Sequence, residues 1–227
     1  MKRIMKAMAA IMLMTAVVCF VSCTKLDDVG HEYVDLGLPS GNLWATCNLG
    51  ASTPESYGDY YAWGETQTKD SYSFDTYKWS HGGYNQLTKY CNDPNFGYNG
   101  FTDDLTTLLP EDDAATVNWG ASWRIPAYND WVELAHHTTQ TWITRNGVKG
   151  MLFTALNGNS LFLPASGKYV RDELCNAGLG GYYWSNLLGV TYPDIVWFLY
   201  SSSGDFCLYD GSSRCCGHTI RPVRSAY

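Results

Sequence analysis

The sequence lacks the short motifs that mark common enzyme and metal chemistry. It contains no Gly-x-Ser-x-Gly nucleophile elbow, no phosphate-binding glycine loop, no His-Glu-x-x-His motif and no Cys-x-x-Cys pair. These motifs respectively carry an activated serine, bound phosphates, a catalytic zinc ion and a structural zinc ion. Their absence favours a protein that is not an enzyme, with no metal and no cofactor.

Positive charge is also scarce. Lysine and arginine number 15 against 22 aspartates and glutamates, so the formal net charge is −7. An acidic surface repels phosphate backbones and anionic lipid headgroups. The charge balance therefore excludes nucleic acid as a partner.

The only long hydrophobic run lies at the amino terminus, from Met8 to Val21, and it is short for a membrane span. Lys2, Arg3 and Lys6 precede it, as in a secretory signal peptide. Phe20-Val21-Ser22-Cys23 resembles a bacterial lipobox, which implies cleavage before Cys23 and lipidation of its sulfur. The alternative is an ordinary cleaved signal in which Cys23 is incidental.

Three segments are expected along the chain. Residues 1–22 form the signal peptide, 23–30 a lipidated tether, and 31–227 one ligand-binding domain. The acidic Thr24-Lys25-Leu26-Asp27-Asp28 is similar to the export tag of Bacteroidetes surface lipoproteins, although Leu26 interrupts the charge run. That similarity implies an outer-membrane, lipid-anchored protein on the cell surface. Removing the signal would change the net charge from −7 to −10, because it carries three positive charges and no negative ones.

Of eight cysteines, six lie beyond Cys23. Disulfides persist in exported proteins, and six cysteines allow many pairings that the sequence leaves open. Cys215 and Cys216 are adjacent, at a Cα separation of about 3.8 Å where a relaxed bridge prefers about 5.5 Å. We therefore expect at least one of the two to point outward or to bond a distant cysteine.

The pattern after Glu32 predicts short strands with a few helices. Strands are expected at 33–36, 43–47, 60–65, 142–144, 148–153 and 160–164, with turns at Asn146-Gly147 and 157–159. Residues 66–101 show no sustained period and are expected to be a long ordered insertion held by its aromatic residues. The pattern predicts a single α+β domain.

Two helices are expected between these strands. Pro110 and the acids Glu111, Asp112 and Asp113 favour a helix start, and Gly120 favours its end. Pro126 opens a second helix, which places Trp131, Leu134 and Ala135 on one face.

Six motifs occur in order along the chain and carry a family resemblance. They are Tyr33-Val34-Asp35-Leu36-Gly37-Leu38-Pro39-Ser40-Gly41, Tyr61-Ala62-Trp63-Gly64-Glu65, Trp119-Gly120-Ala121-Ser122-Trp123-Arg124-Ile125-Pro126, Leu161-Phe162-Leu163-Pro164-Ala165-Ser166-Gly167, Gly181-Tyr182-Tyr183-Trp184-Ser185 and Gly217-His218-Thr219-Ile220-Arg221-Pro222-Val223-Arg224. Over residues 31–224 the chain resembles the Fibrobacter succinogenes major paralogous domain, common in Bacteroidetes lipoproteins. The resemblance implies a C-type lectin-like fold, related to formylglycine-generating enzymes, whose carboxy-terminal sheet presents a ligand surface.

The chain also resembles the variable proteins of diversity-generating retroelements. In those proteins, mutagenesis at adenines changes Asn codons near the carboxy terminus into codons for residues such as Tyr, Ser, Asp and Cys, but never Lys, Glu, Gln, Met or Trp. Residues 185–218 contain no Lys, Glu, Gln or Met, and Trp197 belongs to the apolar frame. Ser212 to Gly217 looks like such a diversified stretch.

The carboxy-terminal region also has the composition of a binding surface. Tyrosine offers a large amphipathic contact area at low entropic cost, and small polar residues adapt their hydrogen bonds. The alternative is a turn-rich, polar β-meander without a binding role. The candidate ligand-binding residues are Asn186, Tyr192, Asp194, Tyr200, Ser202, Asp205, Cys207, Tyr209, Asp210, Ser212, Ser213, Cys215 and Cys216.

Other candidate sites have simpler explanations. Asp103-Asp104 and Glu111 to Asp113 fit loop solvation and helix capping, and His136-His137 fits a solvated helix end. The Glu-Pro-Asn and Trp-Asn-Asp motifs of calcium-dependent lectins are missing, and Asn129-Asp130 lies at a helix start. Arg124, Arg221 and Arg224 belong to the scaffold, with Glu65, Asp35 and Glu133 as expected partners.

The leading interpretation is a surface binding protein for an extracellular protein or glycan. Two alternatives follow from the resemblances. One is an oxidase of the sulfatase-modifying type, although Cys207, Cys215 and Cys216 do not reproduce the cysteine spacing of that family. The other is a subunit of a fimbrial tip adhesin.

Overall fold

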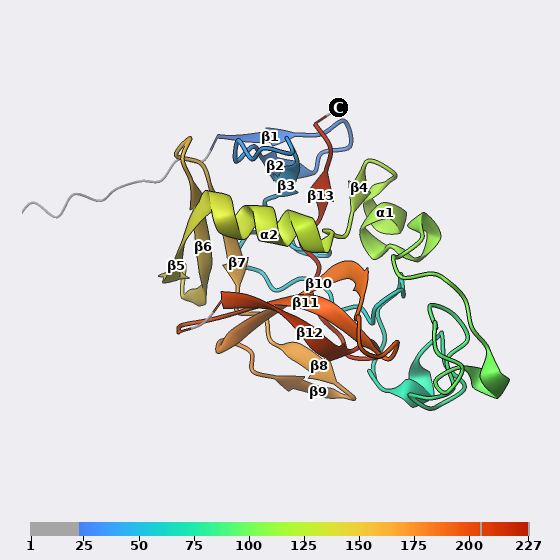
Figure 1. Ribbon diagram of the computed structural model, residues 1–227. Coiled ribbons are helices and arrows are strands. Elements are labelled where there is room, and N and C mark those ends of the chain that lie inside the picture. Colours follow the sequence, from blue (N-terminus) through green and yellow to red (C-terminus); the bar gives the residue numbers. More distant parts are fainter. Residues whose placement is uncertain (1–22, 205, 227) are drawn as a thin grey trace, which may run out of the picture.

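The computed structural model describes residues 23–204 and 206–226 (Figure 1). The expected signal peptide, residues 1–22, lies outside the described residues. The strands are β1 (Thr24–Leu26), β2 (Glu32–Val34), β3 (Leu43–Ala45), β4 (Trp123–Arg124), β5 (Thr138–Arg145), β6 (Val148–Ala155), β7 (Ser160–Pro164), β8 (Lys168–Val170), β9 (Glu173–Cys175), β10 (Gly180–Leu188), β11 (Ile195–Ser202), β12 (Phe206–Ser213) and β13 (Val223–Arg224). The helices are α1 (Ala114–Trp119) and α2 (Tyr128–His137), with single 3₁₀ turns at η1 (Phe74–Thr76), η2 (Tyr98–Gly100) and η3 (Pro110–Asp112).

The two ends of the domain meet in one sheet, of order β1-β2-β3-β13-β4. Val223 of β13 lies opposite Trp44 of β3, and both side chains are fully buried. Within residues 23–30, β1 pairs with β2, and the side chain of Asp27 is buried.

The helix predictions are confirmed, with one adjustment. Pro110 starts the 3₁₀ turn η3, and α1 begins only after Asp113, whose carboxylate accepts a hydrogen bond from Thr116 N at 3.0 Å. Gly120 ends α1 with a φ of 98°. On α2, Trp131 and Leu134 are fully buried, as their spacing predicted.

Three further antiparallel sheets make up most of the remaining regular structure. β5 and β6 form the expected hairpin, because Asn146 and Gly147 adopt the positive φ angles of 49° and 83° that its two-residue turn requires. β7 completes that sheet, β8 pairs with β9, and β10-β11-β12 form the carboxy-terminal sheet.

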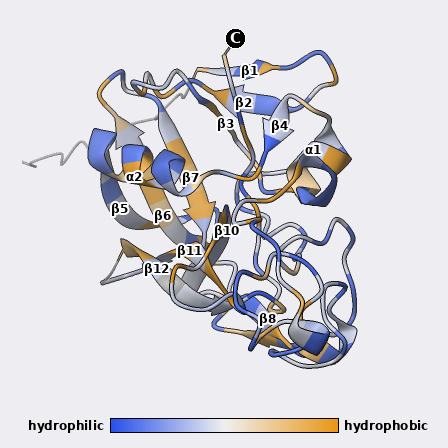
Figure 2. Cartoon of the chain, turned by 45° about the vertical axis from the view of Figure 1, so that its right-hand side comes forward, coloured by the Kyte–Doolittle hydropathy of each residue, from blue (hydrophilic) through white to orange (hydrophobic). Residues whose placement is uncertain are grey.

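The core lies between α2 and these sheets. One cluster joins Trp131 and Leu134 of α2 to Phe153 of β6, Leu163 of β7 and Leu199 of β11, all fully buried. In Figure 2 the hydrophobic colour near α2 lies on β6 and β7, whereas β5 is mainly hydrophilic. Each such side chain contributes about 1.5–3 kcal/mol by leaving water, so this cluster fixes the carboxy-terminal sheet to the rest of the domain.

The prediction of a strand at residues 60–65 is wrong. Only Tyr61 pairs, through an isolated bridge to His218, because aromatic side chains on both sides of the segment are buried and hold it without a partner strand. Beyond it, residues 66–101 contain only the 3₁₀ turns η1 and η2. They nevertheless bury Tyr72, Tyr77 and Tyr90, which agrees with an ordered, aromatic-rich insertion.

The expected partners of the scaffold arginines are also wrong. Arg124 pairs with Asp130, six residues away on the first turn of α2, and Arg224 lies 3.7 Å from Asp27. Arg221 donates to Asn48 and to backbone carbonyls of β3 and its edge. Only the Arg124–Asp130 pair is local in sequence, whereas the terminal sheet brings Arg221 and Arg224 to groups near the start of the domain. Glu65, Asp35 and Glu133 bond to other groups.

The described elements fit an α+β class in which small antiparallel sheets dominate over two helices. None of the helices in the described part of the chain combines the length and the apolar character needed to span a membrane.

Candidate functional site

The carboxy-terminal sheet carries a row of aromatic rings on one face. Tyr182 of β10 stacks on Phe198 of β11, with ring centroids 5.9 Å apart, and contacts Tyr200 at 5.1 Å. Tyr209 of β12 contacts Phe198 at 5.9 Å and Tyr200 at 6.0 Å. The row thus crosses all three strands and ends at Tyr209.

Strand alternation places this aromatic row on the face of the sheet opposite α2. Side chains of successive residues point to opposite faces, so Tyr183 and Leu199 face the cluster around α2, whereas Tyr182 and Phe198 belong to a second buried cluster against which Tyr200 packs. Exposure rises along the row: Phe198 is buried, Tyr200 is half-buried and Tyr209 is 44% exposed. Cys207, opposite Tyr200 in the strand register, is also half-buried. We call Tyr200, Cys207 and Tyr209 the sheet surface.

Tyr192 lies apart from the sheet surface. It belongs to the loop between β10 and β11, is 51% exposed, and packs against Phe96 of the insertion at 5.6 Å. Phe96 in turn contacts Tyr84, which is 55% exposed. The structure therefore separates the candidate tyrosines into two groups, and it joins Tyr192 to aromatic residues of the insertion that sequence reasoning had left without a role.

Several candidates expected on the surface are buried, so their expected exposure is wrong. Ser212 is 2%, Cys215 6% and Cys216 7% exposed. A bulge between β11 and β12 shifts the register beside Ser212, and the chain then turns inward to reach His218 and the terminal sheet. Small polar residue types predicted exposure here, but packing against the tyrosines of the insertion overrides that preference.

The remaining candidates take intermediate positions. Asn186, Asp194, Ser202 and Ser213 are half-buried. Asp210 lies on β12 opposite Trp197, and Asp205 lies outside the described residues. The structure therefore does not bring all the candidate residues into one contiguous patch.

Among the described residues, Ser212 and His218 form an arrangement that resembles a nucleophile and its base. Ser212 Oγ lies 2.9 Å from His218 Nε2, and the ring of His218 stacks on Trp184 with centroids 3.7 Å apart. Burial lowers the pKa of His218 well below its usual value, so the ring stays neutral. His218 Nδ1 has no hydrogen-bond partner within the described residues, and neither residue reaches solvent. The pair therefore serves packing, because a substrate cannot approach it.

The adjacent thiols of Cys215 and Cys216 shift each other's pKa in opposite directions. A hydrogen bond from Cys216 lowers the pKa of Cys215 to about 7, and the same contact together with burial raises the pKa of Cys216. Neither Cys215 nor Cys216 forms a disulfide in the structure, and both are buried. The expectation that one of the adjacent pair points outward or bonds a distant cysteine is thus wrong for this structure.

Arg214 is the residue of this region that sequence reasoning missed. It is fully buried, and its guanidinium donates to Tyr77 Oη at 2.7 Å and to the carbonyls of Tyr90, Pro193 and Lys89 at 2.9, 3.0 and 3.1 Å. It therefore ties the insertion to the end of β12. An arginine between polar residues and cysteines carries no periodic signal, so the sequence offered no means of finding it.

The acidic and histidine pairs have structural roles. Asp103 accepts hydrogen bonds from the backbone N–H groups of Tyr90, Cys91 and Leu105, and Asp130 accepts from Ala127 N at the start of α2. His136 and His137 are exposed at the end of α2, as expected. Within residues 23–204 and 206–226, no three His, Cys, Asp or Glu side chains gather as a metal site.

Comparison of the chain with models of known protein families, with curated proteins and with solved structures finds no match.

Proposed function

We propose that this protein is a lipid-anchored cell-surface binding protein with no catalytic activity, and that it presents its carboxy-terminal region to an extracellular protein or glycan. We propose that its fold is C-type lectin-like and that it belongs to the family that the six sequence motifs resemble. The single observation that supports binding is the aromatic row that leads from buried Tyr182 to exposed Tyr209.

The physical reason is preorganisation. The inner members of the row are buried, so Tyr200 and Tyr209 are held by neighbouring rings before any ligand arrives. Ordering these side chains on binding would cost less than ordering mobile ones, which leaves more of the contact energy as affinity. Tyrosine is among the residues that most often dominate a binding interface.

The test screens the mature protein against arrays of glycans and of extracellular proteins, and then measures the dissociation constant for the strongest ligand. Replacing Tyr200 and Tyr209 together with Ala should weaken binding at least about 30-fold, as expected when a cluster worth about 2 kcal/mol or more is lost. Tyr192→Ala is measured separately, because Tyr192 lies apart from the sheet surface. Val117→Ala, an exposed apolar position on α1, is the matched control. Unchanged affinity of the Tyr200→Ala/Tyr209→Ala variant would exclude the sheet surface.

Anchoring is tested separately. Cys23→Ala should move the protein from the membrane fraction to the soluble fraction, because the sulfur that carries the lipid is removed. Protein that stays with the membrane after this change would contradict the proposed lipid anchor, whatever the binding assay shows.

A further inference from the structure

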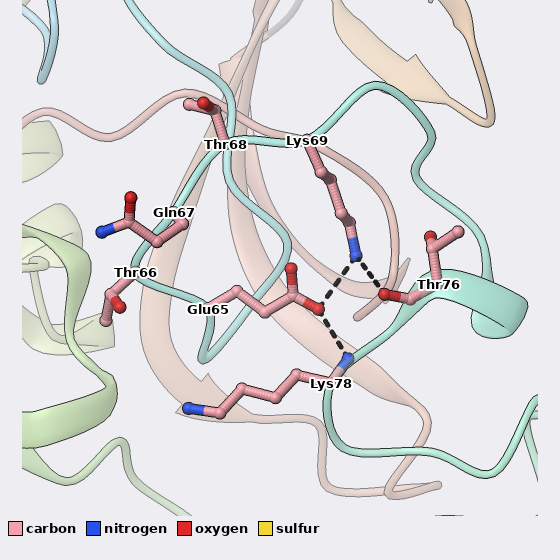
Figure 3. A pocket seen from close by; sticks show the side chains of 7 residues that line it. All are labelled: Glu65, Thr66, Gln67, Thr68, Lys69, Thr76 and Lys78. Carbon is pink, nitrogen blue, oxygen red and sulfur yellow. Dashed lines mark hydrogen bonds and ion pairs between the residues drawn. The ribbon is translucent and has the colours of Figure 1, made fainter.

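A polar pocket of about 350 Å³ lies in the insertion, away from the sheet surface (Figure 3). One continuous stretch of chain forms it as it leaves the buried segment at residues 60–65 and loops back. Its lining residues are Glu65, Thr66, Gln67, Thr68, Lys69, Thr76 and Lys78. Its volume is at the lower end of the range of ligand pockets, about 300–1,000 Å³, and would suit one small ligand unit.

Glu65 is the centre of this pocket. Its residue is only 7% exposed, and one carboxylate oxygen, Oε1, accepts from Lys69 Nζ at 2.9 Å and from Lys78 N at 2.7 Å. The other oxygen, Oε2, has no hydrogen-bond partner among the described residues, and Figure 3 shows it on the side of Glu65 that faces away from Lys78. A nearly buried carboxylate is thus held in place with one acceptor oxygen unused.

Donor groups without a partner inside the protein lie beside Glu65 Oε2. Lys69 Nζ donates two of its three N–H groups, to Glu65 Oε1 and to the carbonyl of Thr76, so one N–H group remains as a donor for a ligand. The side chains of Thr66, Gln67 and Thr68 make no hydrogen bonds to other described residues. The lining therefore offers both donors and acceptors that the protein itself does not satisfy.

The hydrogen-bonding groups of the lining narrow the class of ligand. Glu65 and Lys69 form an ion pair, so their charges largely cancel within the pocket. The ammonium of Lys78 lies 3.4 Å from Asp112 Oδ1, and Asp112 also pairs with Lys89, so two lysines share this carboxylate. A neutral group that both donates and accepts hydrogen bonds matches the unused oxygen of Glu65 and the unused N–H of Lys69. Adjacent hydroxyls on a sugar ring meet this requirement, since one can donate to Glu65 Oε2 while its neighbour accepts from Lys69 Nζ.

We infer that this pocket binds a neutral sugar unit, with Glu65 and Lys69 holding two neighbouring hydroxyls and Gln67 and Thr68 contacting the remainder of the ring. This site is distinct from the sheet surface and does not depend on the proposed function. The two sites could bind different parts of one glycan or different ligands, and each is tested without the other.

The test titrates the mature protein with methyl β-D-glucopyranoside, methyl α-D-mannopyranoside and methyl β-D-galactopyranoside, and follows backbone amide shifts by NMR. At least one glycoside should give saturable shifts confined to residues 65–78, with a dissociation constant on the order of 1 mM. Glucuronate and glucosamine are the charged comparison ligands, and both should bind at least about tenfold more weakly than that glycoside, because their charge would lose water while Glu65 and Lys69 already pair with each other.

Substitutions then assign the contacts. Gln67→Ala and Thr68→Ala remove exposed side chains without internal hydrogen bonds, so both variants should fold normally and together weaken binding about tenfold, as the loss of two hydrogen bonds implies. Gln86→Ala, an exposed glutamine outside the pocket, is the matched control and should leave binding unchanged. Glu65→Gln replaces the free acceptor by a donor and should weaken binding further.

Three outcomes would overturn the inference. One is the absence of saturable shifts at residues 65–78 with all three glycosides. The second is equal affinity for glucuronate or glucosamine, and the third is unchanged affinity in the Gln67→Ala/Thr68→Ala double variant. The Tyr200→Ala/Tyr209→Ala variant should bind the glycoside normally, so a failure at this pocket is distinguishable from a failure of the proposed sheet surface.

Discussion

Replacing Arg214 should destabilise this protein more than any surface substitution. The guanidinium makes four hydrogen bonds inside the protein, three of them to backbone carbonyls, and lies 5.2 Å from the ring centroid of Trp63 and 5.1 Å from that of Tyr77. In Arg214→Met those three carbonyls would lose their donors while remaining buried. Each carbonyl buried without a donor costs about 1–3 kcal/mol. The methionine side chain of the variant would carry no charge that must be desolvated, and this gain offsets part of the cost. We expect a net loss of about 3–5 kcal/mol.

Urea unfolding followed by tryptophan fluorescence measures that loss directly. Arg171→Met, an exposed arginine, is the matched control and should change the free energy of unfolding by no more than about 0.5 kcal/mol. Arg214→Lys should recover little, because an ammonium cannot span four acceptors that the planar guanidinium reaches together. Amide hydrogen exchange in the variant should rise first around residues 77–90, where the lost bonds end. A loss below about 1 kcal/mol for Arg214→Met would refute this account of how the insertion is held.

Three further predictions concern other buried contacts. In Gly217→Ala a new Cβ would lie 2.8 Å from the ring of Tyr72, so thermal unfolding should show a loss of about 1–3 kcal/mol, and an unchanged melting temperature would contradict the packing. Ser212→Ala should cost a similar amount in urea, because His218 Nε2 would be buried without a partner, whereas Ser203→Ala on the exposed β11–β12 turn should cost almost nothing. Burial alone would raise the pKa of Asp27, but hydrogen bonds from a tryptophan indole and from backbone N–H groups outweigh it and lower the pKa from 3.8 to about 2. The stability it contributes is therefore present above about pH 4 and lost as the pH falls toward 2, and Asp27→Asn should flatten the pH dependence of the urea midpoint in that window.

Local sequence signals predicted the β5–β6 hairpin and the presence of both helices. Asn146-Gly147 specified the hairpin because few other residue pairs adopt two successive positive φ angles, and Gly120 marked the end of α1, although the predicted start at Pro110 belongs to the 3₁₀ turn η3. In each case the determining interaction spans only a few residues. Such interactions can be recognised without knowing what the rest of the chain does.

The candidate site was predicted less well, because exposure depends on contacts between distant segments. Tyr209 and Ser212 lie three residues apart on one strand and looked equally exposed from residue type. In the folded chain Tyr209 is 44% and Ser212 2% exposed, since the register shifts beside Ser212 and its hydroxyl bonds to the buried ring of His218. The pocket around Glu65 was missed for a different reason: it forms within one stretch of chain, whose hydrogen bonds to Glu65 from residues 69 and 78 belong to an irregular loop without a periodic pattern.

The tyrosine excess has a use beyond filling the core or facing a ligand. In an insertion with few regular elements, backbone carbonyls cannot rely on strand or helix partners, and a buried carbonyl without a donor is costly. Tyr77 Oη donates to the carbonyl of Trp63 at 2.6 Å, and Tyr72 Oη and Tyr60 Oη donate to those of Tyr60 and Ser166. Each ring therefore packs like a hydrophobic residue while its hydroxyl satisfies an irregular backbone. High tyrosine content alone is thus weak support for a binding surface. Tyr200 and Tyr209 support one because they lie at the exposed end of the aromatic row.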